Sequence, residues 1–160
     1  MYMPKTPAWN QNIGMYLSGY ADGEGSFCVS FSPRPKLKTR VEVRPSFSVS
    51  QNGDRREVLD LFVEYFHCGT IRKNSSDKTY KYEVRSLGDL ERIIIPHFYA
   101  FPLLSAKQKD FEKFAIICGL MTIKKHTSSV TLKEILDIAF TMNASGIRKF
   151  TKETLLHLMT

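Results

Sequence analysis

The sequence has 160 residues, which is the length of one domain, and hydrophobic residues make up 42% of it. A core of real size can therefore be buried, which argues against intrinsic disorder. Lysine and arginine number 23 against 16 aspartates and glutamates, so the formal net charge is +7 and a polyanionic partner is favoured. The longest apolar run, residues 114–121, is far shorter than the roughly 18 residues of a membrane span, so we expect no membrane partner.

The cysteines and the first residues of the chain bear on its compartment. Cys28, Cys68 and Cys118 cannot all pair, and none has C-x-x-C spacing, which argues against a disulfide framework or a zinc knuckle. Residues 1–5 lack the charged-then-apolar layout of a signal peptide. Together these features predict an intracellular protein without a cleavable targeting signal.

The first third of the chain predicts one helix and two strands. Asn10 or Asn12 can cap a helix that runs from about Ile13 into Asp22. Strict alternation predicts strands over 26–32 and 39–50, and Pro45 predicts a bulge or an unpaired position in the second. The side chains expected to face the core are Phe27, Val29, Phe31, Val41, Val43, Phe47 and Val49.

Helical spacing then returns from Asp54 to Phe66, and Gly69 is expected to end that segment. A hairpin follows, with strands over 70–73 and 79–85 joined by a polar turn. A short helix around Leu90 and Ile94 is expected to stop at Pro96.

Two capping boxes predict the helices of the last third. Ser105-x-x-Gln108 opens a helix through Met121, and Thr131-x-x-Glu134 opens another through Asn143. Thr151 begins a final short helix. The element order predicts an α+β fold in one domain over 1–160, with an antiparallel four-stranded sheet and helices packed on one of its faces.

The outward face of the predicted sheet is polar at successive positions and is not expected to be buried under helices. In the first two strands it carries Ser, Arg and Glu side chains, and in the hairpin Lys, Glu and Arg. Such a face is commonly solvated surface. In a chain of net charge +7, it is also suited to reading base edges in a DNA major groove.

The least ordinary stretch is Leu17-Ser-Gly-Tyr-Ala-Asp-Gly-Glu-Gly25, which joins the first helix to the first strand. An ordinary helix C-cap and tight turn would account for its glycines. An EF-hand is excluded by Pro33 at the last ligand position, and a dinucleotide-binding loop is excluded by Cys28 at the third glycine. Carboxylates at a helix end beside glycines suit a divalent metal. If a second copy packed against small residues of this helix, two Glu24 carboxylates would meet at a twofold axis.

The same nine residues resemble the signature of the LAGLIDADG homing endonucleases, and the element order resembles that family's αββαββα core with added C-terminal helices. The resemblance is closest to the small single-motif members, which act as homodimers. It implies that the sheet forms a DNA-binding saddle and that two copies of the motif helix meet at the dimer interface. The residues assigned to that interface are Gly14, Leu17, Ser18, Ala21 and Asp22.

The resemblance also implies roles for residues at matching positions. Glu24 would bind Mg²⁺ together with the backbone carbonyl of Gly23, and Mn²⁺ or Ca²⁺ could substitute in binding. Gln51 would order the metal-bound water, with Arg55 as an electrostatic helper. Lys107 would lie near the scissile phosphate. Without the resemblance, Gln51 and Arg55 form a strand-to-helix turn, and Lys107 is a solvated lysine at a helix end.

These assignments predict a homodimeric, site-specific endonuclease that hydrolyses double-stranded DNA at a long pseudo-palindromic site and takes no small-molecule substrate. The alternatives are a non-cleaving DNA- or RNA-binding relative, such as an intron RNA maturase, and a basic structural domain. Members of the family are usually encoded within introns of organellar or microbial genes, so the resemblance implies an organellar (chloroplast or mitochondrial) or microbial origin. The four histidines have no ligand-like spacing and are expected at the surface or an interface. The candidate DNA-binding residues are Ser30, Ser32, Arg34, Arg40, Glu42, Arg44, Ser46, Ser48, Arg55, Arg72, Asn74, Lys81, Glu83, Arg85, Arg148 and Lys149.

Overall fold

The computed structural model describes residues 8–123 and 128–160. Its first half contains α1 (Ala8–Glu24), β1 (Gly25–Pro33), β2 (Val41–Asn52), a 3₁₀ turn (Gly53–Arg55), α2 (Glu57–Phe66), β3 (Thr70–Lys73) and β4 (Thr79–Val84). Its second half contains α3 (Leu87–Asp89), a π-helical turn (Leu90–Ile94), α4 (Ile95–Ala100), α5 (Lys107–Ile123), α6 (Ser129–Ala139) and α7 (Lys152–Leu158). The α+β fold class predicted from the sequence is confirmed.

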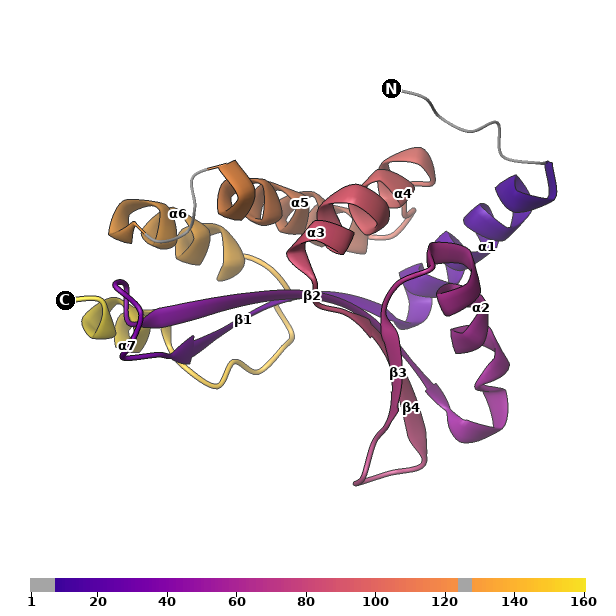
Figure 1. The fold of residues 1–160 in the computed structure, drawn as a ribbon, viewed down its shortest axis with the longest axis horizontal. Helices are drawn as coiled ribbons and strands as arrows, with labels where there is room; N and C mark the ends of the chain where they lie inside the picture. The colour runs from indigo at the N-terminus through magenta and orange to yellow at the C-terminus, as the bar shows by residue number, and fades with distance from the viewer. Residues whose placement is uncertain (1–7, 124–127) are drawn as a thin grey trace.

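The four strands form one antiparallel sheet in the order β1-β2-β4-β3. β1 pairs with β2 along its whole length, from Gly25 opposite Val49 to Pro33 opposite Val41. β4 pairs with β2 only from Phe47 to Asn52, so the β3–β4 hairpin joins one end of the long β1–β2 ribbon. The hairpin projects from that end, away from α5 and α6 (Figure 1).

The core lies between the sheet and the helices. Every strand side chain expected to face inward in β1 and β2 is buried, which confirms the alternation. The ring of Phe27 is central, with its centroid 5.1–5.4 Å from the rings of Phe47, Phe98, Phe111 and Phe114. β2, α4 and α5 therefore converge on β1, and the opposite face of the sheet carries the polar side chains.

Several boundaries differ from the expectation. α1 begins at Ala8 and ends at Glu24, so Asn10 and Asn12 lie inside the helix rather than at its start. Pro45 causes no bulge, since the β1–β2 register runs through it opposite Val29. Pairing with β4 starts only at Phe47, so Pro45 is unpaired on that side, which confirms the second of the two predicted alternatives.

Pro96 does not end a helix but lies in the first turn of α4. The preceding π-helical turn explains this, because its backbone bond from Ile95 N–H to Leu90 O spans a wider loop than an α-helical bond. The wider turn makes room for a ring that would clash in a regular α-helix. His67, in the left-handed conformation, caps α2 two residues before Gly69.

Neither predicted capping box forms. The N-cap of α6 is Ser128, whose hydroxyl accepts from Thr131 N–H, and the helix ends at Ala139 rather than Asn143. Gln108 accepts from Leu103 N–H instead of Ser105 N–H. Thr151 caps α7 as expected.

The three cysteines are free, in line with the argument against a disulfide framework. Within residues 8–123 and 128–160, no helix combines the length and apolar character needed to cross a bilayer. Residues 1–5 and His126 lie outside the described part of the chain.

Candidate active site and nucleic-acid interface

Glu24 is the last residue of α1, and β1 starts at the next residue. The join is tight at Gly25, where a Cβ atom would lie 2.6 Å from the carbonyl oxygen of Ala21. Only glycine fits there, so the chain passes from helix to strand without a loop. Glu24 is exposed, and none of the hydrogen bonds or salt bridges among the described residues involves its carboxylate.

Asp22 caps the entrance of α5 and is not free to bind a metal. Its carboxylate accepts from the N–H groups of Leu104 and Ser105, both at 3.0 Å, and from the Ser105 hydroxyl. Slight burial raises the pKa of Asp22, but these hydrogen bonds and the charge of Lys107 outweigh it and hold the pKa below its usual value. Asp22 therefore stays ionised and fixes α5 to the end of α1.

Lys107 makes the reciprocal contact. Its Nζ donates to the carbonyls of Ala21 at 3.0 Å and Gly25 at 2.6 Å, which places a cation at the negative end of the α1 dipole. Burial lowers the pKa of Lys107, against the opposing charges of Asp22, Glu24 and others. Lys107 thus lies beside Glu24, as expected if both residues belong to one active site.

Gln51 reaches the same end of α1 from β2. Its amide nitrogen hydrogen-bonds to the hydroxyl of Tyr20 on α1, and its oxygen accepts from Asn52 N–H at 2.7 Å. Tyr20 is not among the site residues predicted from the sequence, because it occupies a motif position at which the family signature has leucine. Arg55 lies in the 3₁₀ turn just beyond and is exposed.

The donor set on one protomer can supply only part of a metal shell. Among the described residues, no group of three or more His, Cys, Asp or Glu side chains could hold an ion. Mg²⁺ prefers six oxygens and is commonly held by one or two carboxylates together with water and substrate phosphates. An exposed Glu24 beside the exposed Gly23 fits that pattern, provided that a second carboxylate and phosphate oxygens come from outside the protomer.

Four of the residues predicted for the interface on α1 lie inside the protomer. Leu17, Ser18 and Ala21 are buried inside the protomer. A Cβ atom at Gly14 would lie 2.7 Å from the Phe101 ring, so that glycine packs against the protomer's own side chains. These residues face the core, and the helix has a different exposed face.

That exposed face, which we call the glycine face, consists of Met15, Tyr16, Gly19 and Gly23. A Cβ atom at either glycine would meet nothing within 4 Å. Met15 and Tyr16 are 65% and 49% exposed, which is high for large apolar side chains. The glycines are four residues apart and leave the helix backbone open to close approach.

His97 was expected at a surface or interface but is only 7% exposed. Ser18 Oγ donates to the carbonyl of Phe101 at 2.7 Å and lies 3.0 Å from His97 Nε2. The hydroxyl proton is used, so Nε2–H donates to Ser18, and Nδ1 is buried with no partner among the residues that the structure describes. His97 therefore supports α1 from within the core, which explains the conflict with the sequence-based expectation.

The polar face of the sheet is hollowed into a groove of about 420 Å³. It brings together seven of the predicted DNA-binding residues, namely Ser30, Arg44, Ser46, Ser48, Lys81, Glu83 and Arg85. Ser32, Arg34, Arg40 and Glu42 lie at the far end of the β1–β2 ribbon, and Arg72 and Asn74 lie on the hairpin. Ser48 and Glu83 are 6% and 8% exposed, so these two are less accessible than the sequence suggested.

Arg148, predicted to contact phosphate, serves the protomer's own fold. Its guanidinium donates to Val29 O at 3.0 Å and to Ala139 O, and it lies over the ring of Phe140. Asn143 makes a similar bond to Phe27 O at 2.9 Å, so both side chains satisfy carbonyls along β1, the edge strand. Among the described residues, no acidic partner pairs with the neighbouring Lys149.

Comparison with known proteins shows the family to which this chain belongs. The LAGLIDADG endonuclease family profile matches residues 17–118. A probable intron-encoded endonuclease of Neurospora crassa is 35% identical over 140 residues, which is 87% of this chain and 31% of that protein. The chain therefore spans under a third of that fungal relative.

Two solved structures have the same fold. The homing endonuclease I-TnaI superposes with a TM-score of 0.79 at 32% identity and covers 91% of this chain and 94% of its own. The LAGLIDADG homing endonuclease I-LtrWI, solved bound to its target DNA, superposes with a TM-score of 0.83 at 30% identity over 88% of this chain and 47% of its own. This chain belongs to the LAGLIDADG endonuclease family.

Proposed function

We propose that this protein is a site-specific endonuclease that hydrolyses both strands of a long DNA target with the help of Mg²⁺. The single observation that carries the proposal is the position of Glu24. It is an unpaired, exposed carboxylate at the end of the motif helix, next to Lys107 and two residues before the groove-lining Ser26. Glu24 thus lies between the glycine face and a basic groove, which supports its assignment as the metal ligand.

Double-stranded DNA is the partner that suits the polar face. The net charge of +7 attracts a polyanion, and the groove offers serine hydroxyls together with lysine and arginine donors. A two-stranded β-ribbon has the width to enter a major groove, where each base pair presents its own pattern of donors and acceptors. The relative I-LtrWI, with the same fold, was solved with its target DNA.

A homodimer is the assembly that completes the site. The glycine face exposes apolar surface at Met15 and Tyr16 beside two glycines that permit close helix packing. Two copies related by a twofold axis would bring their Glu24 carboxylates together and join their grooves into one surface. I-TnaI has nearly the same chain length, whereas I-LtrWI has about twice that length, so a fused pair of such domains would build the same surface.

In the proposed reaction, Glu24 and the Gly23 carbonyl would hold Mg²⁺, which would supply a more acidic bound water and stabilisation of the leaving oxygen. Lys107 offsets the charge that develops on the phosphate, since its Nζ is already fixed beside Glu24. Gln51 orients the water through its amide, which Tyr20 holds in place. Arg55, exposed in the 3₁₀ turn beyond Gln51, adds positive charge next to the site.

Replacing Glu24 by glutamine tests the proposal, because the variant keeps the shape of the side chain and removes a metal ligand. Cleavage of a selected DNA target in Mg²⁺ should fall at least about a thousandfold. Binding to the same DNA should change less than about threefold, because the groove is untouched. Glu64→Gln on the exposed side of α2 is the matched control and should cleave normally. Retained cleavage in Glu24→Gln would overturn the metal assignment, and DNA binding without any cleavage by the wild type would favour a binding-only relative.

A further inference from the structure

Two carboxylates on the polar face each hold two basic side chains. Glu42 Oε2 accepts from Arg34 Nη1 at 3.0 Å and from Arg44 Nη2 at 2.6 Å. Glu83 pairs with Lys81 Nζ at 3.4 Å and with Arg85 Nε at 2.9 Å. The first triad lies on the β1–β2 ribbon and the second on β4, so each part of the sheet carries one.

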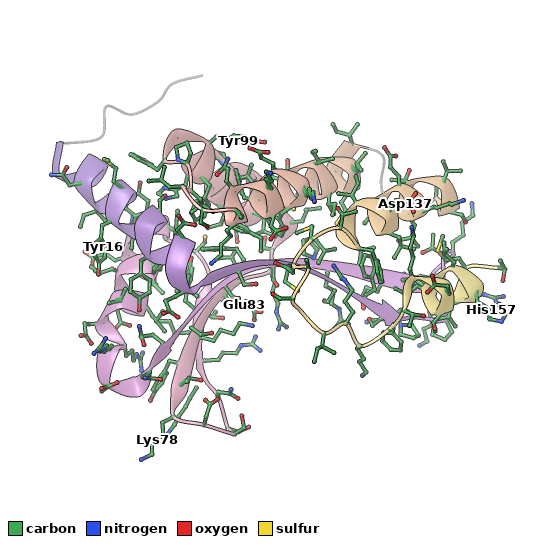
Figure 2. The ribbon with its side chains drawn as sticks, turned by 180° about the vertical axis from the view of Figure 1, so that it is seen from behind. Tyr16, Lys78, Glu83, Tyr99, Asp137 and His157 are labelled. Carbon is green, nitrogen blue, oxygen red and sulfur yellow. The ribbon has the colours of Figure 1, made fainter. Side chains whose placement is uncertain are left out.

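Glu83 is the more deeply placed of the two. Its side chain is only 7% exposed, whereas those of Lys81 and Arg85 are 45% and 58% exposed. It lies opposite Ser48 on one neighbouring strand and Thr70 on the other, in the angle between the β1–β2 ribbon and the hairpin (Figure 2). A buried carboxylate needs paired charges to offset its lost hydration, and the two basic side chains supply them.

The bonding pattern decides which nitrogens of the arginines remain available. Arg85 forms an ion pair with Glu83 through Nε, at 2.9 Å from Oε2, and both terminal Nη groups are free of Glu83. Arg44 also uses Nε, at 3.0 Å, together with Nη2. A carboxylate on the Nε side fixes the guanidinium plane and directs the outer edge away from the strand, where it can meet guanine or phosphate.

The same contacts commit one oxygen of Glu42 and both oxygens of Glu83 to side chains of the protein itself. Glu42 Oε2 accepts from Arg34, Arg44 and, at 3.5 Å, from Ser32, so this oxygen is committed to side chains of the protein itself. The hydrogen bond from Arg44 and the charges of both arginines lower the pKa of Glu42 below its usual value despite some desolvation, so it stays charged. Glu83 has both oxygens engaged and is too buried to approach a base edge.

We propose that Glu42 and Glu83 are positioning residues that hold Arg34, Arg44, Lys81 and Arg85 in fixed orientations before DNA arrives, and that they thereby set sequence discrimination. The proposal rests on the DNA-binding function proposed above and deepens it. Each carboxylate should weaken the affinity for DNA in general, because it places a negative charge near the phosphates. In return, each should increase the preference for the target sequence. Both glutamates are thus expected to act through the cations they hold.

Glu83→Gln and Glu42→Gln test this proposal against the matched control Glu64→Gln. All three raise the net charge from +7 to +8, so nonspecific DNA should be bound at least as tightly as by the wild type in each case. In the two groove variants, the ratio of target to nonspecific affinity should fall about tenfold, with relaxed preference at two or more base pairs. The control should keep the wild-type ratio. The side chain of Glu42 is more exposed than that of Glu83, so Glu42→Gln should fold normally. It therefore still tests the proposal if Glu83→Gln fails to fold.

An unchanged ratio in both groove variants would overturn the proposal. Relaxation at a single base pair would also overturn it, because that result identifies a glutamate that reads a base itself. Arginine Nε–H resonances of the DNA-free protein give a readout that does not depend on DNA. Glu42→Gln should shift the Arg44 signal and Glu83→Gln the Arg85 signal, each without affecting the other. If the wild type binds no DNA, the proposed function fails, and the Nε–H signals alone then decide whether the carboxylates position the arginines.

Discussion

Replacing Gly19 by alanine separates the stability of the protomer from its association. A Cβ atom at Gly19 meets nothing within 4 Å in the protomer, so the added methyl group fits there without strain. Alanine is favoured over glycine inside a helix by about 1 kcal/mol. For a chain of this length we expect a melting temperature about 2–4 °C higher at protein concentrations where the protomer is monomeric.

Association should respond in the opposite direction. If two α1 helices pack through the glycine face, each new methyl group enters a contact made for hydrogen. Overpacking of this kind costs roughly 1–3 kcal/mol, which weakens the dimer about 5- to 150-fold. Sedimentation equilibrium measures the dissociation constant, and thermal unfolding of dilute protein measures the stability of the protomer.

Gly14→Ala is the control on the same helix, and the opposite pattern of effects is expected for it. Its methyl carbon would lie 2.7 Å from Phe101 Cε2 and 3.0 Å from the Tyr65 hydroxyl, so the protomer should lose stability while the dissociation constant changes little. A Gly19→Ala protein that is more stable and dimerises with unchanged affinity would refute the proposed interface. Weakened association in Gly14→Ala alone would return the interface to the face that the sequence suggested.

Three further predictions concern His97, Arg148 and Lys149. Burial lowers the pKa of His97 to about 4, below its value in the unfolded chain, so its contribution is complete above about pH 6.5 and is lost as the pH falls toward 4. Urea unfolding across that range should show about 3 kcal/mol of pH-dependent loss that His97→Phe lacks, and equal loss in both proteins would contradict a neutral buried imidazole. Arg148→Ala should destabilise the fold by about 1–3 kcal/mol and leave the salt dependence of DNA binding unchanged, because its bonds are internal. Lys149→Ala should flatten that salt dependence by about one charge at unchanged stability, and the reverse pattern would restore Arg148 as a phosphate contact.

The strands were predictable because each has one buried and one exposed face. Apolar and polar residues therefore alternate with a period of two along the sequence. Phe27, Val29 and Phe31 face the core, as their alternation with polar residues indicated. The motif also located Glu24 correctly at the junction of helix and strand, since glycine is required where β1 starts against the last turn of α1. Local rules sufficed wherever the determining contact lies nearby in the sequence.

The errors share one physical cause, which is competition from distant residues. Ser105 and Gln108 have the spacing of a capping box, but Asp22, more than eighty residues away, takes the Ser105 N–H group. α1 carries small residues on two of its faces, and sequence spacing alone does not indicate which face the core covers. Arg148 has the sequence context of a surface cation, and only the exposed carbonyls of the β1 edge explain why it turns inward.

A cleavage selection from randomised DNA in the presence of Mg²⁺ tests the central claim most directly. We predict that the wild-type protein enriches one long, nearly palindromic site cut on both strands, and that Glu24→Gln enriches none. A twofold arrangement of two identical protomers requires the symmetry, and the sheet on each protomer accounts for each half of the site. Cleavage without sequence preference, or enrichment of the same products by Glu24→Gln, would contradict the account.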